Sequence, residues 1–163
     1  MKIQIGGGEH DARIQNFNPC TCLGIADDWK YDDIYSFYDM TADEEDYAEF
    51  IDEDRRNVND HYEVLENNEL IGFFCVIREG ASIEIGLGMR PDNCGRGKGE
   101  TYVMQIIRFI EQHYSFGRLI MNVACFNQRA IKVYRSCGFK ETEITNRRSN
   151  GGMYAFLTMI KDY

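Results

Sequence analysis

The segment that most restricts the fold is a glycine-rich stretch between an apolar run and an amphipathic run. Residues 82–89 (SIEIGLGM) predict a buried strand, and residues 90–100 (RPDNCGRGKGE) follow at once. From residue 99 to 114, apolar side chains recur at the spacing of one helix face: Tyr102, Val103, Ile106, Ile107 and Ile110. A strand, a glycine loop and a helix N-terminus in this order favour an anion site, because free backbone N–H groups and the helix dipole attract negative charge.

The residues of this loop fit the same interpretation. Gly95, Gly97 and Gly99 let the backbone approach a ligand without a Cβ, while Arg96 and Lys98 add positive charge. The spacing excludes a P-loop, and it lacks the third, helix-packing glycine of a dinucleotide-binding fingerprint. A purely structural glycine turn is the alternative that this loop alone leaves open.

The other expected elements place this loop in a mixed α/β sheet with helices packed on it. The length of 163 residues suits one domain, residues 1–163. Strands are expected at 12–17, 61–66, 69–78, 82–89, 118–125, 139–145 and 154–160, with hairpin turns at Asn67-Asn68 and Asn150-Gly151-Gly152. Helices are expected at 19–29 with Asn18 as N-cap, from a Thr41 capping box to 54, at 99–114 and at 127–137, and residues 31–38 predict a loop or bent helix.

A second motif follows the strand expected at 118–125. Residues 127–139 have the form N-x-x-A-x-x-x-Y-x-x-x-G-F, in which Asn127 predicts a helix N-cap and Gly138 a C-cap. Ala130 allows close approach, and Tyr134 lies about two helical turns after Asn127. Each of these residues also fits a plain role as cap, core or turn.

The two motifs together, with the intervening helix and strand, resemble the GCN5-related N-acetyltransferase (GNAT) superfamily. The resemblance covers residues 60–163 well, and residues 1–60 only in layout. It implies a mixed, mostly antiparallel sheet of six to seven strands, splayed between the fourth and fifth and flanked by about four helices. Residues 35–39 and 150–159 are similar to a bacterial subgroup whose substrates are unassigned.

The resemblance also implies how acetyl-CoA would be bound as cosubstrate. Backbone groups around Gly88, Met89 and Arg90 would pair with the pantetheine arm, and Asn127 would contact the pantetheine or the acetyl end. The pyrophosphate would be bound by Gly95, Arg96, Gly97, Lys98, Gly99 and Glu100. One position departs from the family pattern, because Cys94 stands where Arg or Gln is usual.

The implied reaction is direct attack of a primary amine on the thioester. Tyr134 would act as general acid toward the leaving thiolate. The amine must be neutral to attack, and Glu84, an acid in an otherwise apolar strand, is our candidate base. Glu84 alternates with Gly86 and Gly88, which leaves room for a ligand on that face; an exposed strand residue is the alternative interpretation. The Met89 N–H is expected to stabilise the oxyanion.

The charge distribution bears on the acceptor. Residues 1–60 carry sixteen acids and five bases, a balance of −11, and the remaining residues carry +2, for a net charge of −9. This total disfavours nucleic-acid binding, which needs a basic face. Carboxylates and aromatic rings suit a cationic amine, so we expect a small basic amine or a peptide N-terminus as acceptor. The candidate acceptor-binding residues are Tyr31, Asp32, Tyr35 and Tyr38.

Several broader expectations complete the interpretation. No apolar stretch approaches the ~20 residues of a membrane span, and the N-terminus lacks the apolar core of a signal peptide, so a cytoplasmic protein without membrane contact is expected. Of six cysteines only Cys20 and Cys22 are close, without a second zinc-spaced pair, which predicts free thiols and no metal.

Two alternative functions and the oligomeric state stay open. One is a non-catalytic acyl-CoA-binding module or sensor that has lost activity. Another is transfer from a different donor such as succinyl-CoA, with which the basic residues between 129 and 148 are compatible. Because dimers are common among similar proteins, the oligomeric state, monomer or homodimer, also stays open.

Overall fold

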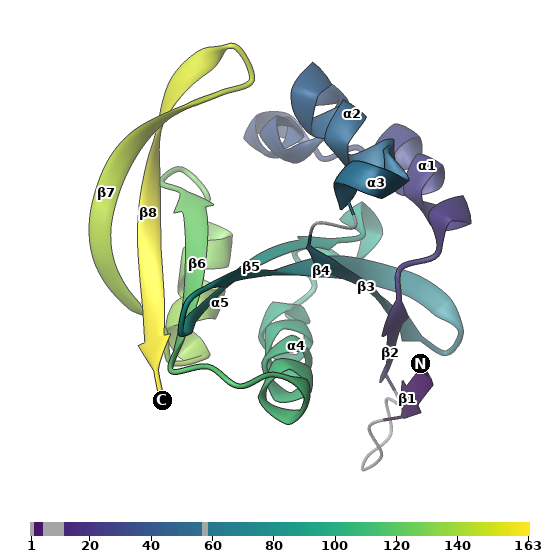
Figure 1. The fold of residues 1–163 in the computed structure, drawn as a ribbon. Helices are drawn as coiled ribbons and strands as arrows, with labels where there is room; N and C mark the ends of the chain where they lie inside the picture. Colours follow the sequence, from purple (N-terminus) through teal and green to yellow (C-terminus); the bar gives the residue numbers. More distant parts are fainter. Residues whose placement is uncertain (1, 5–11, 57–58) are drawn as a thin grey trace. The chain divides into compact units, whose positions relative to one another are not determined.

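The computed structural model describes residues 2–4, 12–56 and 59–163 (Figure 1). Within these residues, eight strands form one sheet in the order β1-β2-β3-β4-β5-β6-β8-β7. The strands are β1 (Lys2–Gln4), β2 (Ala12–Asn16), β3 (Asp60–Glu66), β4 (Glu69–Glu79), β5 (Ser82–Met89), β6 (Arg118–Ala124), β7 (Lys140–Ser149) and β8 (Gly152–Asp162). The expected mixed α/β sheet is confirmed, and β1 adds a strand that the sequence analysis did not include.

The strand pairing is mostly antiparallel. Among the described residues, β5 and β6 pair in parallel through Ser82–Glu84 and Arg118–Ile120. Parallel neighbours need a long crossover connection, and α4 (Gly99–His113) is the helix within it. The paired register stops at Glu84 and Ile120, whereas β5 ends at Met89 and β6 at Ala124.

The chain divides into two compact units. Unit 1 comprises residues 1–75 and 87–92, and unit 2 comprises residues 76–86 and 93–163, so the boundary crosses β4 and β5. Unit 1 contains α1 (Pro19–Asp28), the 3₁₀ helices η1 (Asp33–Tyr38) and η2 (Met40–Ala42), α2 (Glu44–Ile51) and α3 (Glu53–Arg56). Unit 2 contains α4 and α5 (Gln128–Ser136). None of the helices in the described residues combines the length and apolarity needed to cross a membrane.

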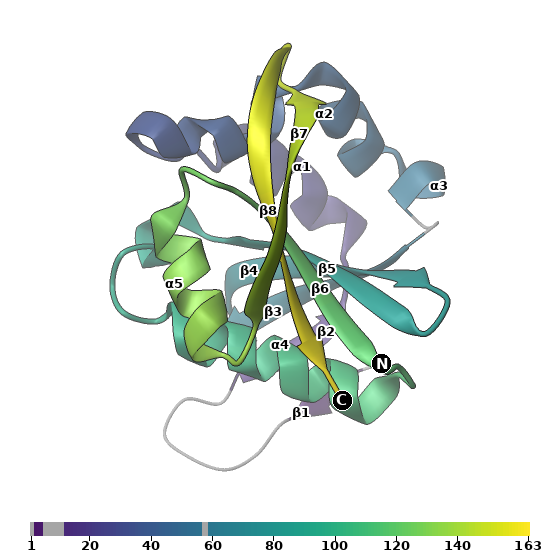
Figure 2. The ribbon, with the colours of Figure 1, turned by 90° about the vertical axis from the view of Figure 1, so that its left-hand side faces the viewer.

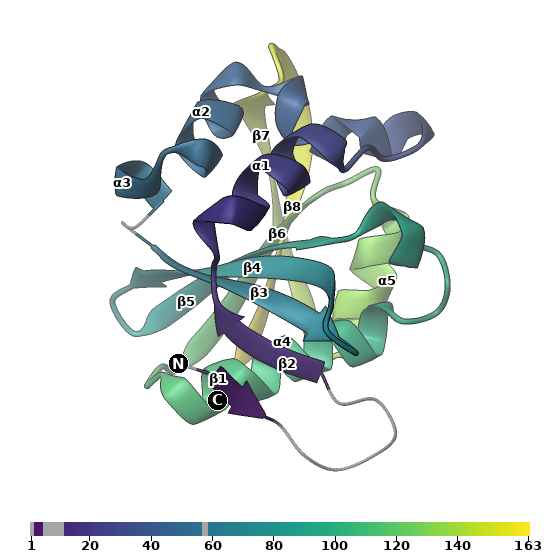
Figure 3. The same ribbon diagram turned by 90° about the vertical axis from the view of Figure 1, so that its right-hand side faces the viewer.

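In unit 1, α1 and α2 lie next to each other (Figure 3) and share a small apolar core. Its buried members are Cys22, Ile25, Ala26 and Phe50, and the Phe73 ring of β4 packs against them. A buried carboxylate also ties α1 to the sheet, because Glu63 of β3 is 2% exposed and accepts from the Thr21 hydroxyl at 2.8 Å. Gln15 of β2 donates to the same carboxylate. Apolar packing and this polar link together hold α1 on its unit.

In unit 2, α4 buries the apolar face that the sequence predicts, and α5 contacts β6. Figure 2 shows α5 next to α4. Alternate β6 residues Leu119, Met121 and Val123 are buried, whereas Ile120 and Asn122 between them are only half-buried. This period of two gives β6 one core face and one opposite face. The sheet of unit 2 thus has a face that its own helices do not bury.

The helix expected from Thr41 to residue 54 is wrong at its start and in its continuity. Thr41 lies in η2, and α2 begins at Glu44 with Asp43 as N-cap, whose carboxylate accepts from the N–H groups of Glu45 and Asp46 at 3.0 and 3.3 Å. Asp52 then ends α2 and accepts from the N–H groups of Asp54 and Arg55, which starts α3. A carboxylate cap followed by acids in the first turn suits the helix dipole better than the Thr41 capping box.

The hairpin turns follow from left-handed backbone positions. Asn67 and Asn68 have φ of 53° and 67°, as expected for a two-residue turn of asparagines. The closing turn uses Asn150 and Gly151, with φ of 49° and 72°, so β7 and β8 are longer than expected. A β-bulge interrupts their register between Glu141 and Glu143.

The corrected cap gives a stability prediction. Replacing Asp43 with alanine removes the acceptor for two N–H groups, so Asp43→Ala should lower the free energy of unfolding by about 1 kcal/mol. Thr41→Ala, the matched control, should cost less than about 0.5 kcal/mol, because within the described part of the chain the Thr41 side chain bonds only to the exposed Lys30 ammonium. Urea unfolding followed by circular dichroism measures both, and the reverse order would contradict Asp43 as the cap.

Candidate functional site

The glycine loop of unit 2 leads directly into an uncapped helix. Gly95 and Gly97 have φ of 71° and 75°, a left-handed conformation that glycine adopts without strain. At the N-cap, Lys98 makes no side-chain capping bond, although α4 is 15 residues long. The first-turn N–H groups of a helix have no partner within it. The amides that begin α4 are therefore available to an anion.

Positive side chains surround this loop. Arg96 and Lys98 are exposed within it. Arg129, from the first turn of α5, places Nη1 3.6 Å from where a Cβ on Gly95 would lie. In the sequence, Arg129 is only one of the bases between residues 129 and 148. No local pattern places it beside the loop, because the packing of α5 against the start of α4 brings the two together.

Cys94 contributes no charge to the loop. Its side chain is half-buried, and burial raises the pKa of the thiol even though the nearby Arg129 charge opposes this. The neutral thiol stands where the family pattern has Arg or Gln. The neighbouring Arg129 guanidinium brings positive charge to the same stretch of backbone.

Gly99 has a packing role. A Cβ on this residue would lie 2.9 Å from Cγ2 of Val133, so glycine is what lets α4 and α5 approach closely. The thiol of Cys137, the C-cap residue of α5, also donates to the Glu100 carbonyl at 3.8 Å. Of the three glycines expected to admit a ligand, Gly95 and Gly97 shape the loop, and Gly99 fixes its helix against α5.

The second motif folds as predicted around α5. Asn127 is the N-cap, and its Oδ1 accepts from the Ala130 N–H at 3.1 Å. Tyr134 is 8% exposed and faces the Phe139 ring, with centroids 6.2 Å apart. In the same unit, Glu84 is half-buried on β5 and pairs with Ile120 of β6. Unit 2 thus contains the glycine loop, Asn127, Tyr134 and the candidate base Glu84.

In unit 1, the structure joins two residues that the sequence analysis assigned to different ligands. The Tyr31 hydroxyl donates to the Met89 carbonyl at 2.8 Å, and the Tyr31 N–H donates to the Asp39 carboxylate at 2.9 Å. Tyr31 therefore ties the segment before η1 to the last residue of β5. The expected acceptor-side tyrosine and the expected pantetheine-binding backbone are in direct contact.

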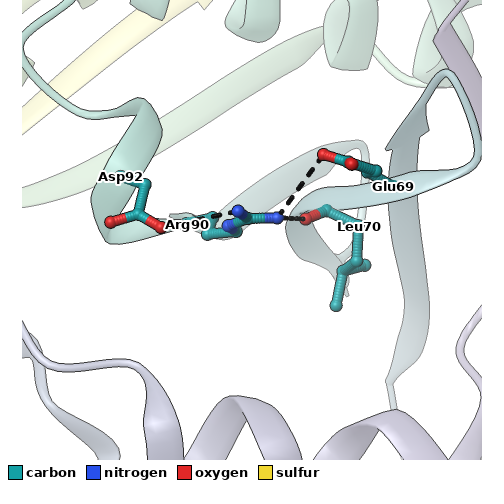
Figure 4. A network of polar contacts seen from close by, with 4 residues as sticks. All are labelled: Glu69, Leu70, Arg90 and Asp92. Atoms are coloured by element: carbon teal, nitrogen blue, oxygen red, sulfur yellow. Dashed lines mark hydrogen bonds and ion pairs between the residues drawn. The ribbon is translucent and has the colours of Figure 1, made fainter.

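Arg90 fastens the end of β5 to β4 (Figure 4). Its N–H donates to the Ile71 carbonyl at 2.8 Å, and its guanidinium lies 3.5 Å from the Leu70 carbonyl. The same guanidinium lies 3.9 Å from the Glu69 carboxylate and 3.4 Å from that of Asp92. The Arg90 side chain is thus engaged within unit 1.

The space expected beside Gly88 is filled. A Cβ on Gly88 would lie 2.5 Å from Cε1 of Phe73, so the missing side chain makes room for this ring. The alternation of Glu84, Gly86 and Gly88 predicts room for a ligand on this face, and at Gly88 this prediction is wrong. A cross-strand aromatic ring was the alternative that the sequence pattern alone did not reveal.

The remaining acceptor-side candidates belong to one short element. Asp32 is the exposed N-cap residue of η1, while Tyr35 and Tyr38 lie half-buried within it. Tyr38 packs edge-on against Phe37, with ring centroids 5.2 Å apart. Aromatic and acidic groups are therefore grouped along η1, next to the Tyr31 link.

Comparison with protein families identifies residues 26–139 as a match to the acetyltransferase (GNAT) family. No curated protein matches the chain in sequence. Among solved structures, the spermidine N-acetyltransferase from Vibrio cholerae in complex with CoA and spermine has a TM-score of 0.73 at 17% identity, over 93% of this chain and 95% of that one.

Two further solved structures share the fold. YncA from Salmonella typhimurium, a putative acetyltransferase with acetyl-CoA, has a TM-score of 0.66 at 14% identity, over 93% of each chain. RimL, a ribosomal L7/L12 alpha-N-protein acetyltransferase in complex with coenzyme A, has a TM-score of 0.73 at 12% identity, over 98% of each chain. At these sequence identities, the similarity to the solved structures shows a shared fold and nothing more specific.

The loop backbone gives a second prediction. Gly97→Ala forces a Cβ into the left-handed region and should lower the free energy of unfolding by about 1–2 kcal/mol. Gly117→Ala is the matched control, since the nearest atom to its new Cβ is the Ala81 carbonyl oxygen at 3.9 Å. Its cost should stay within about 0.5 kcal/mol. Equal losses in chemical denaturation would show that the Gly97 conformation is not required.

Proposed function

The chain belongs to the acetyltransferase (GNAT) family, and we propose that it acetylates a primary amine with acetyl-CoA as the donor. The acceptor amine is carried by a small basic molecule or by a peptide N-terminus. The observation that carries the proposal is the uncapped N-terminus of α4 behind Gly95 and Gly97. The whole chain, residues 1–163, acts as one acetyltransferase domain in this proposal.

The donor set of the loop fits the pyrophosphate of CoA. Backbone amides and the helix dipole favour a diphosphate, and Arg96, Lys98 and Arg129 supply three cations within the same loop and adjoining helix. Glu100 is the one acid in the first turn of α4. Cationic side chains therefore outnumber acids around these amides.

The proposed chemistry uses Glu84 and Tyr134 on opposite sides of the reaction. Glu84 takes a proton from the acceptor ammonium, directly or through water, because only the neutral amine attacks a thioester. The Tyr134 hydroxyl donates a proton to the thiolate as it leaves. Tyr134 is supported in this role by its place on α5, the helix that packs on the start of α4.

Unit 1 supplies the support for an amine acceptor. Tyr31, Asp32, Tyr35 and Tyr38 present aromatic faces and a carboxylate, which favour a cationic group. The formal charge of −11 over residues 1–60 also favours a cationic acceptor. Met89, which we propose as the backbone donor to the oxyanion, has its carbonyl held by Tyr31.

The deciding experiment has two stages. Calorimetry with CoA and acetyl-CoA should detect binding, and no heat with either would overturn the proposal. Release of free thiol from acetyl-CoA should then require an amine from a mixed panel. Binding without thiol release would support a non-catalytic acyl-CoA sensor, and faster release from succinyl-CoA would identify a different donor.

Tyr134→Phe tests the general acid. Removing the hydroxyl should lower kcat by about 10²-fold or more, with the KM for acetyl-CoA little changed, because proton transfer acts in the transition state. A thermal melt controls for folding, since Tyr134 is 8% exposed. An unchanged kcat in the folded variant would remove Tyr134 from the mechanism.

Arg129→Gln tests the pyrophosphate site. Loss of this cation beside Gly95 should weaken CoA binding by about threefold to tenfold, an effect reduced by solvent exposure and by added salt. Lys132→Gln is the matched control, because Lys132 is an exposed cation one helical turn further along α5. Equal weakening in calorimetry would point to general electrostatics rather than to a contact.

A further inference from the structure

A row of polar side chains crosses the unit 2 sheet on the face opposite its buried residues. Ile120 pairs with Glu84 of β5, and Asn122, two residues further along β6, pairs with Thr158 of β8. On β7, Arg147 pairs with Tyr154, which shares the alternation of Thr158. Directly opposed residues project to the same side. Glu84, Asn122, Thr158 and Arg147 therefore occupy one face.

Arg147 is held in place on this face. Its Nη2 donates to Asn122 Oδ1 at 3.0 Å, and its Nε donates to the Thr145 hydroxyl at 3.2 Å. The guanidinium carbon lies 5.7 Å from the centroid of the Phe156 ring. The side chain thus reaches from β7 across β8 to β6, three strands that run side by side in Figure 1. An arginine fixed by three groups loses little further freedom when it binds a ligand.

Asn122 offers a second donor beside Arg147. A guanidinium only donates, so the oxygen of the Asn122 amide must face Arg147. The Thr158 hydroxyl donates to the same oxygen at 2.8 Å. The amide nitrogen therefore turns its two N–H donors away from these groups. Arg147 Nη1 has no acceptor among the described residues. The Asn122 amide nitrogen and Arg147 Nη1 together therefore form a site made of hydrogen-bond donors.

Glu84, the candidate base, lies near these donors on the same face of the sheet. Adjacent strands are about 4.8 Å apart and rise about 3.3 Å per residue, so the backbones of Glu84 and Asn122 are separated by about 8 Å. One face thus presents a carboxylate, which suits an ammonium, next to donors, which suit an oxygen. An ammonium beside a carbonyl or carboxylate oxygen is the chemistry of an α-amino acid or a peptide N-terminus.

We infer that Arg147 and Asn122 bind an oxygen that the acceptor carries next to its reacting amine. This inference rests on the proposed function and narrows it. The acceptor is then a peptide N-terminus or an amino acid, and Arg147 determines specificity by binding the peptide carbonyl or the carboxylate. A polyamine has no such oxygen and brings only positive charge toward the guanidinium.

Three acceptors separate the possible sources of this oxygen. A tripeptide with a free amine offers a carbonyl, the matching free amino acid offers a carboxylate, and spermidine offers neither. We expect the tripeptide or the amino acid to have a higher kcat/KM than spermidine, and their ratio identifies which oxygen is bound. Spermidine as the best acceptor would overturn the inference and leave the acetyltransferase function standing.

Substitutions at Arg147 test the residue itself. Arg147→Met should raise the KM for the oxygen-bearing acceptor about tenfold, with kcat and the KM for acetyl-CoA unchanged. The activity on spermidine should not fall, because the substitution removes a positive charge that repels a polyamine. Arg147→Lys should raise this KM by less than Arg147→Met does, because lysine keeps the charge but not the planar set of donors. Arg148→Met is the matched control, since this neighbour is exposed and projects to the other face of β7.

A structural role for Arg147 would change the thermal midpoint and affect all three acceptors alike, and that outcome would overturn the inference. Equal effects of Arg147→Met and Arg148→Met would overturn it too. Tripeptide binding by calorimetry gives a readout independent of turnover: Arg147→Met should weaken this binding about tenfold, and Arg148→Met should preserve it. If CoA fails to bind, the proposed function falls, and the peptide titration still decides the role of Arg147.

Discussion

The availability of the backbone amides at the start of α4 is the constraint on which the remaining features of unit 2 depend. A helix of 15 residues that begins without a side-chain cap leaves its first N–H groups to water or to a ligand. Gly95 and Gly97 turn the chain into this position, and Gly99 lets Val133 approach so that α5 holds the helix in place. Arg129 then brings a cation to the loop from the same helix that carries Tyr134.

Unit 1 is organised around the end of β5 rather than around a loop. The Tyr31 hydroxyl on the Met89 carbonyl, the Arg90 guanidinium near Leu70 and Glu69, and the Phe73 ring against Gly88 all act on three consecutive residues. A strand end with so many partners has a fixed backbone. That rigidity supports the proposed role of Met89 as a donor of fixed position, because preorganised donors stabilise charge without reorganisation.

The sequence predicts those parts of the fold that depend on local patterns. The bounds of β5, the apolar face of α4, the Asn127 cap and the Asn67-Asn68 turn follow from periodicity and from the conformations that each residue type adopts. Contacts between distant segments are not encoded in such patterns. The Phe73 ring at Gly88, the Tyr31 bond to Met89 and the Arg129 contact with the loop depend on tertiary packing. The Thr41 prediction failed for a local reason, because two competing caps stand two residues apart.

The last strand of the sheet also has to avoid pairing with other molecules. β7 is a terminal strand in the order of the sheet, and an edge strand offers unpaired backbone groups to any extended chain. The bulge between Glu141 and Glu143 breaks its regularity, and Lys140, Arg147 and Arg148 add charge along it. Bulges and charges are features that protect edges from aggregation. The strand that carries Arg147 therefore combines two of the features by which a sheet edge is kept from pairing with other extended chains.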